Sequence, residues 1–250
     1  GEGTVTVTKA RLNTAGDGSP CIYSTGTISA TDAKGIATGS EATVIEGRNS
    51  ITLLRADLTG SRKCGVMLYQ SFSGDAAAGV ARLTMSDSKL TAERGPLFYI
   101  TNTRAEVKVS NCALVRSDKA PLISVAPGRW GRSGENGGHL SFTATRQVLV
   151  GDVAVSESST CALTLNAGSS YSGTLDAAGR AKELSLVVAK DATVSLTGDS
   201  HVTSLADADA TFSNIRSNGH KLYYLAASCP ALGGRTVALP GGGSLLPETL

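Results

Sequence analysis

The sequence has few aromatic residues and little charge. Its 250 residues include 4 Phe, 6 Tyr and 1 Trp, and charged side chains make up 18% of the chain. The 23 Lys and Arg residues nearly balance the 21 Asp and Glu residues, so a net charge of +2 gives no basic footprint for nucleic acid. No stretch approaches the ~18 consecutive apolar residues of a membrane-spanning helix. We therefore expect neither a nucleic-acid partner nor membrane insertion.

Cysteine and histidine are too scattered to indicate a metal or redox centre. The five cysteines are odd in number, widely spaced and form no Cys-x-x-Cys motif. We expect buried thiols, with a bridge between Cys21 and Cys64 as an alternative. The three histidines show no spacing typical of metal ligands. The sequence therefore predicts no cofactor and no metal site.

Glycine is abundant, with 29 residues, and short alternating segments take the place of a helical period. Residues 4–7, 51–53 and 107–109 alternate apolar with polar side chains, which is typical of strands. Gly, Asn, Asp and Ser separate such segments, as turns require. These patterns indicate an all-β protein.

An internal repeat indicates the architecture. An apolar position recurs at spacings of 23, 23, 32 and 24 residues, and three further positions keep the same register. The four columns are Val5, Ile28, Ile51, Leu83 and Val107; Val7, Ala30, Leu53, Met85 and Val109; Ala10, Ala33, Ala56, Ser88 and Cys112; and Leu12, Gly35, Leu58, Leu90 and Leu114. A period near 23 residues with several strands per period predicts a parallel β-helix, in which equivalent side chains of successive coils stack about 4.8 Å apart.

The repeat continues more loosely after Leu140, at spacings of 20 to 23 residues. We therefore predict one domain over residues 1–250, a single right-handed parallel β-helix of about nine coils with a period of about 21–24 residues. Residues 1–138 are expected to form regular longer coils with two loop insertions, and residues 139–239 shorter coils. The Gly-rich tail 240–250 is expected to end the ordered core.

A fifth apolar position near the end of each repeat points to a possible binding face. Its members are Ile22, Ile45, Leu68, Phe98 and Ile123. If these side chains point inward, the residues that follow them point outward, since strand side chains alternate. The outward column is Tyr23, Glu46, Tyr69, Tyr99 and Ser124. We expect Tyr69 and Tyr99 to occupy equivalent positions on adjacent coils.

Two insertions leave from the ends of these strands. They are Ser71–Gly79 and Pro127–Gly138, and Asn102 and Arg104 lie between them in the expected coil order. The second insertion holds Trp130, the only tryptophan. Aromatic faces with amide, guanidinium and carboxylate partners are how proteins hold sugar rings. The predicted ligand-binding residues are Tyr23, Glu46, Tyr69, Tyr99, Asn102, Arg129 and Trp130.

Two other interpretations of this face stay open. Stacked tyrosines also stabilise sheets without any ligand, and Trp130 would then fold back to plug the groove. A polysaccharide lyase or glycoside hydrolase would need carboxylates clustered on neighbouring coils. Glu46 has no carboxylate in its column, and Asp75 in the first insertion is the nearest partner. No catalytic residue is predicted, and an enzyme site near Glu46, Asp75 and the Trp130 loop is the alternative.

Four segments, residues 40–51, 69–76, 95–103 and 128–131, resemble a group of uncharacterised bacterial secreted or surface proteins. These look like right-handed parallel β-helices and are often described as adhesin-like or carbohydrate-binding. The second half also resembles the passenger coils of autotransporters. The resemblance implies a non-enzymatic module of a larger secreted or cell-surface protein, with a glycan or another surface protein as its partner. A purely structural stalk is a second alternative.

Overall fold

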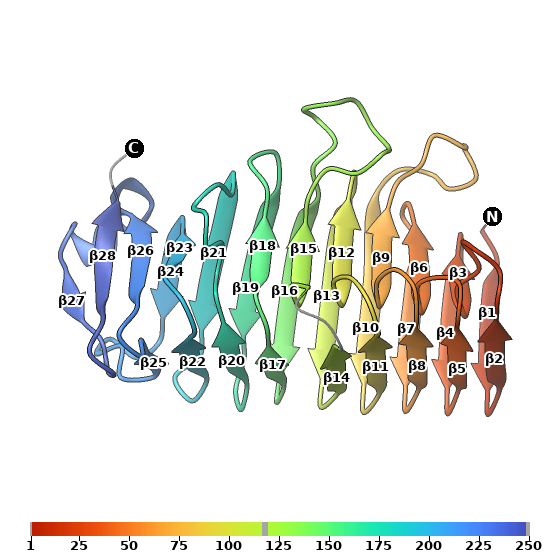
Figure 1. The fold of residues 1–250 in the computed structure, drawn as a ribbon, viewed down its shortest axis with the longest axis horizontal. Coiled ribbons are helices and arrows are strands. Elements are labelled where there is room, and N and C mark those ends of the chain that lie inside the picture. Colours follow the sequence, from red (N-terminus) through yellow and green to blue (C-terminus); the bar gives the residue numbers. More distant parts are fainter. Residues whose placement is uncertain (1, 117–119, 249–250) are drawn as a thin grey trace.

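The computed structural model describes residues 2–116 and 120–248. The chain is an all-β parallel solenoid of about eleven turns, which confirms the predicted β-helix (Figure 1). The turn count is slightly above the predicted nine. Within the described residues, the helical segments are two short 3-10 helices, η1 (Ala226–Ser228) and η2 (Pro230–Leu232). No helix of the described chain is long and apolar enough to cross a membrane.

The longest sheet runs along most of the solenoid and has nine parallel strands. In spatial order they are β1 (Thr4–Thr8), β4 (Thr27–Thr31), β7 (Ser50–Leu54), β10 (Val80–Ser86), β13 (Arg104–Ser110), β16 (His139–Thr145), β19 (Thr160–Leu165), β21 (Glu183–Val188) and β24 (Ser204–Asp207).

The second face of the solenoid consists of two shorter sheets placed end to end. The first contains β2 (Arg11–Thr14), β5 (Lys34–Ala37), β8 (Asp57–Gly60), β11 (Lys89–Ala92) and β14 (Ala113–Arg116). The other contains β17 (Val148–Val150), β20 (Ser170–Gly173), β22 (Thr193–Leu196) and β25 (Ile215–Arg216).

The third face also has two sheets, and the first of them carries the candidate site. It contains β3 (Ile22–Ser24), β6 (Thr43–Glu46), β9 (Val66–Tyr69), β12 (Phe98–Thr101), β15 (Ile123–Val125) and β18 (Val153–Val155). The other contains β23 (Ser200–Val202), β26 (Lys221–Leu225), β28 (Ser244–Glu248) and β27 (Val237–Ala238), of which β27 pairs antiparallel to β28.

The strand pairing confirms three of the predicted columns. Ile28 pairs with Ile51, Ile51 with Leu83, and Leu83 with Val107. The columns that begin at Val7 and Leu12 keep the same register. Ile51, Leu83 and Val107 are at most 1% exposed, whereas Val5 in the first coil is 50% exposed. Val5 lies on β1, the edge strand of this sheet, so a paired strand covers it on one side only.

The fifth column was predicted correctly for Ile45 with Leu68 and for Phe98 with Ile123, but in the wrong register at its other two steps. Ile22 pairs with Thr43, and Ile45 pairs with Ser24 and Leu68. The turn of residues 15–21 before β3 is two residues longer than the turn of residues 38–42 before β6, so constant spacing misaligns the strands. A shift of two residues keeps each side chain on its face.

The predicted equivalence of Tyr69 and Tyr99 is wrong for a separate reason: it aligned Phe98 with Leu68, whereas Phe98 pairs with Val66 and Ile100 pairs with Leu68. Tyr99 pairs with Met67, and Tyr69 pairs with Thr101 and Glu46. The tyrosines remain on the outer face but lie diagonally across it.

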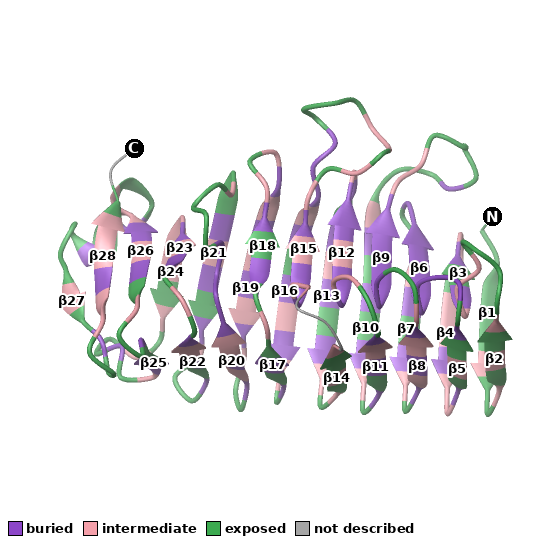
Figure 2. Cartoon of the chain, in the orientation of Figure 1, coloured by how far each residue is buried: buried purple, intermediate pink, exposed green. Residues whose placement is uncertain are grey.

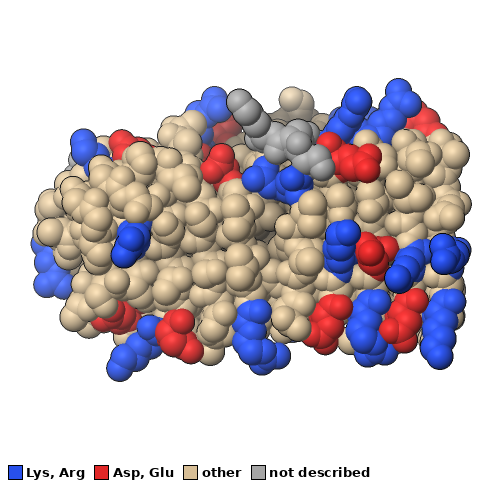
Figure 3. All heavy atoms as spheres, turned by 60° about the horizontal axis from the view of Figure 1, so that its bottom comes forward, with Lys and Arg blue, Asp and Glu red and all other residues tan. Residues whose placement is uncertain are grey.

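Charged residues of both signs alternate along the turns of the N-terminal half. Lys9, Asp32, Arg55 and Asp87 occupy equivalent turn positions with φ of 50 to 54°. Arg55 Nε donates to Asp32 at 2.7 Å and holds the pKa of that carboxyl below its usual range. Figure 3 shows rows of positive and negative side chains along this part of the surface. Neighbouring coils therefore place opposite charges side by side, which stabilises the observed strand register relative to a shifted one.

One further expectation is wrong. The Gly-rich tail does not end the ordered core, since β28 pairs with β26 and buries Leu245 completely. The cysteines are free thiols, as expected, and Cys64, Cys161 and Cys229 are buried, whereas Cys21 and Cys112 are half-buried. The alternative bridge between Cys21 and Cys64 does not form.

Candidate functional site

Two neighbouring strands are buried on both faces. All four residues of β6 and all four of β9 are buried, whereas most strands of the solenoid alternate between buried and more exposed positions (Figure 2). The outward side chains of these strands are Val44, Glu46, Met67 and Tyr69, and none is more than 9% exposed. Something outside the solenoid therefore covers this part of the third face.

The covering element is the insertion that follows β15. It crosses β12 and places Trp130 on the ring of Tyr69, with ring centroids 4.5 Å apart and planes tilted by 49°. The Arg129 guanidinium lies 4.2 Å from the centroid of the Trp130 ring, at cation–π distance. Trp130 and Tyr99 pack against a small apolar cluster separate from the solenoid core, formed by Val44, Cys64, Met67 and Tyr69. The apolar cluster and the insertion together form a second core outside the solenoid, which we call the external core.

Asn102 connects the two insertions, which stand side by side above the strand ends in Figure 1. Its side-chain Nδ2 donates to the carbonyl of Gln70 at 2.8 Å, and its backbone N–H donates to the carbonyl of Asn136 at 3.1 Å. Asn136 in turn donates to the carbonyl of Trp130 at 2.8 Å. The position needs φ of 51°, which Asn tolerates better than most residues. Asn102 therefore positions the Trp130 loop and does not line a pocket with it.

Glu46 is 1% exposed and serves as an acceptor for hydroxyl groups. It accepts hydrogen bonds from Tyr23, from Tyr69 at 3.2 Å and from Ser71. The Tyr23 and Tyr69 hydroxyls also lie 2.9 Å apart. This network ties the first insertion to the outer face, since Ser71 opens that insertion. Burial, together with the neighbouring Glu46 carboxylate, raises the pKa of both tyrosines.

Tyr23 should ionise well above the ordinary tyrosine pKa of about 10. Its stabilising contribution is complete below pH ~10 and is lost as the pH rises toward the folded-state pKa, because the unfolded chain ionises first. A pH titration followed by phenolate absorbance, in the native protein and in Tyr23→Phe, measures the pKa of Tyr23. Glu46→Gln removes a neighbouring negative charge and should lower the pKa of Tyr23, whereas Glu106→Gln on β13 should not. An ordinary Tyr23 pKa in the native protein would contradict the network.

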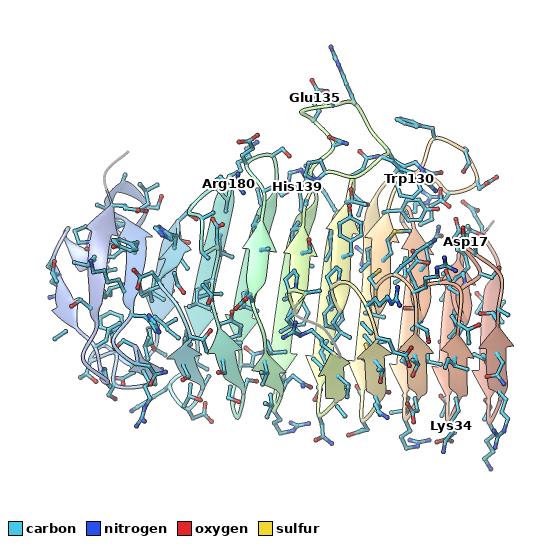
Figure 4. All side chains as sticks on the ribbon, in the orientation of Figure 1. Asp17, Lys34, Trp130, Glu135, His139 and Arg180 are labelled. Atoms are coloured by element: carbon cyan, nitrogen blue, oxygen red, sulfur yellow. The ribbon has the colours of Figure 1, made fainter. Side chains whose placement is uncertain are left out.

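A pocket of about 490 Å³ opens beside the external core. Val44 and Met67 form its floor, and Tyr23, Tyr69, Tyr99 and Trp130 contribute aromatic walls. Polar groups lie at the rim, where Lys63 Nζ is 3.7 Å from Glu41 and 3.5 Å from Asp17. Figure 4 shows Trp130 at the loop-bearing edge of the solenoid, with Asp17 on the side of the N-terminus. An apolar floor with aromatic walls and a few polar rim groups is typical of small-molecule sites.

The pocket gathers most of the predicted binding residues. Five of the seven line it, namely Tyr23, Tyr69, Tyr99, Arg129 and Trp130. Glu46 and Asn102 lie behind it and hold its walls. Asp75 is exposed in the first insertion, where its backbone N–H donates to the Ser73 hydroxyl at 3.2 Å. Pattern analysis missed the residues Glu41, Val44, Lys63, Cys64, Met67 and Pro96. For Val44 and Met67 a signal existed, since each is an apolar residue at an outward strand position.

In the described chain, no group of three or more His, Cys, Asp or Glu side chains is placed to hold a metal ion. Comparison with known protein families, curated proteins and solved structures finds no match to this chain.

Proposed function

We propose that the protein is a non-enzymatic binding module of a secreted or cell-surface protein, and that the aromatic pocket beside Trp130 holds a sugar ring of a glycan. The observation that supports it is the open pocket beneath the tryptophan: Trp130 packs on Tyr69 yet leaves about 490 Å³ between itself, Tyr23 and Tyr99. A loop that only plugged the groove would fill this space.

The rim supplies the polar partners that sugar hydroxyls need. Lys63 and Arg129 can donate to a ligand. The Tyr99 hydroxyl contacts the carbonyl of Pro127 at 3.4 Å, a weak bond that a ligand can replace. Sugar rings stack their C–H faces on aromatic side chains and direct hydroxyls to such groups.

The hydrolase or lyase alternative gains little support from this geometry. The Glu46 carboxylate is buried and accepts hydrogen bonds from four hydroxyl groups, those of Tyr23, Tyr69, Ser71 and, at 3.4 Å, Ser73, which leaves it poorly placed to reach a glycosidic bond. A glycan array tests the proposal, and incubation of the bound polysaccharides with assay of released reducing and unsaturated ends tests the enzyme alternative. Binding without product release is expected. An array without any binding would favour the structural stalk.

Trp130→Ala should weaken binding of a glycan found on the array by about 2 kcal/mol, the typical cost of removing a stacked aromatic anchor. Calorimetric titration measures it. Tyr223→Ala is the matched control, because Tyr223 is a partly exposed aromatic on β26 that stacks on His201 far from the pocket. Equal affinity of the two variants would contradict the proposed site.

A further inference from the structure

A second hollow lies on the other side of the Trp130 loop. It has a volume of about 1030 Å³ and is bounded by the loop, by the turn after β18 and by the segment before β21. Four basic side chains line it, namely Arg129, His139, Arg180 and Lys182. An adjoining depression of about 450 Å³ shares His139 and adds Arg104. Figure 4 places Arg180, His139 and Trp130 along the same loop-bearing edge, with Glu135 on the loop above.

The fold brings these basic side chains together from distant parts of the sequence. His139 opens β16 and pairs with Arg104 of β13 on one side and with Thr160 of β19 on the other. Thr160 in turn pairs with Glu183 of β21. Lys182 directly precedes Glu183 in the chain and therefore lies close to this row of paired residues. The buried Asp176 accepts the backbone N–H of Ala181 at 2.7 Å and fixes the turn that presents Arg180 and Lys182.

Most of this positive charge has no partner within the protein. In the described part of the chain, no carboxylate lies within 4.0 Å of Arg104, Arg180 or Lys182. Two acids line the hollow, Glu135 and Glu157, and Glu135 is engaged by Arg132 at 3.6 Å. Unpaired like charges repel one another, so a bound anion would relieve an existing electrostatic cost.

The surroundings of His139 show that the cations act on one another. The ring is half-buried, and its Nδ1 lies 3.1 Å from the Thr160 hydroxyl. Burial, followed by the charges of Arg104 and Lys182, lowers the pKa of His139. An anion bound here would favour the charged imidazolium and raise that pKa.

We propose that this hollow binds the sulfate or carboxylate groups of an acidic polysaccharide. Guanidinium groups match the planar carboxylate and the sulfate oxygens with paired hydrogen bonds. Arg129 and Gly128 line both this hollow and the aromatic pocket, so one chain can place a ring on the aromatics and an acidic group in the hollow. That the ligand is a polysaccharide rests on the proposed function, whereas the binding of an anion in the hollow does not depend on it.

Calorimetry with three oligosaccharides of equal length tests the inference: one sulfated, one polyuronic and one neutral. The double variant Arg180→Ala/Lys182→Ala should bind the acidic ligands about tenfold more weakly than the native protein at low salt, and the difference should shrink at high salt. Lys34→Ala/Lys108→Ala removes the same charge from exposed positions elsewhere and should change nothing. Preference for the sulfated or the polyuronic ligand identifies the anion. Equal affinity for acidic and neutral ligands would overturn the inference.

A second measurement separates this site from the aromatic pocket. NMR titration, with the His139 signal assigned by His139→Gln, should show that inorganic sulfate raises the pKa of His139. A pKa that sulfate leaves unchanged overturns the anion site, whatever the aromatic pocket binds. A rise with sulfate, without binding of any oligosaccharide, supports the anion site and contradicts the proposed function.

Discussion

Replacing Ile51 with alanine should lower the free energy of unfolding by roughly 2–5 kcal/mol, as large-to-small changes in cores do. Ile51 is fully buried and pairs with Ile28 on one coil and Leu83 on the next. The cavity would lie in the middle of a continuous column, where β-strands on both sides restrict collapse. Denaturant unfolding followed by circular dichroism measures the change.

Thr52→Ala is the matched control for that experiment. Thr52 lies on the same strand, β7, but is exposed, so its truncation should change the free energy of unfolding by no more than about 0.5 kcal/mol. Similar effects at Ile51 and Thr52 would contradict the inward assignment of the column.

Glu46→Ala should cost about 2–3 kcal/mol, because it leaves the Tyr69 and Ser71 hydroxyls without their charged acceptor in a covered environment. The first insertion should also become more accessible to protease, since Ser71 loses its bond to the outer face. Thermal and denaturant unfolding measure the first effect, and limited proteolysis the second.

Glu183→Ala provides the control for Glu46→Ala, because Glu183 is an exposed acid on β21. Its replacement should have an effect of about 0.5 kcal/mol or less. A Glu46→Ala protein more stable than the native one would contradict the structural role of the carboxylate. It would instead favour the enzyme alternative, since functional side chains are often retained at a cost in stability.

The regular columns were predictable because burial repeats with the period of the coil. Ile51 and Leu83 each fill the same position as the residue below them, and the sequence spacing records this directly. The third-face register was not predictable in the same way. Between β3 and β6 it depends on the length of the turn before β3, and turn lengths on the surface vary without disturbing the core. Between β9 and β12, Phe98 and Ile100 are both buried, and the sequence spacing does not show which of them aligns with Leu68.

Most of the residues that line the aromatic pocket were singled out in the sequence, but their geometry was not predicted. Because side chains alternate along a strand, Tyr23, Tyr69 and Tyr99 were expected on the outer side of the sheet. Trp130, the only tryptophan, lies in an insertion between Gly128 and Gly131, and this position indicated that the insertion contributes to the outer face. The contact of Trp130 with Tyr69 joins residues across an intervening strand, and no periodic signal encodes such a contact. The hollow lined by Arg129, His139, Arg180 and Lys182 was not predicted either. Residues from the turns of different coils form it, and no periodic signal records such an arrangement.

Tryptophan fluorescence tests the central claim most directly, because Trp130 is the only tryptophan of the chain and lines the proposed pocket. The native protein is titrated with an oligosaccharide found on the array, and the emission is compared with calorimetry on the same samples. We predict a saturable change in emission whose dissociation constant equals the calorimetric one, and the same change in Tyr223→Ala. Calorimetric binding with no change in tryptophan emission would contradict the assignment of the ligand site to this pocket.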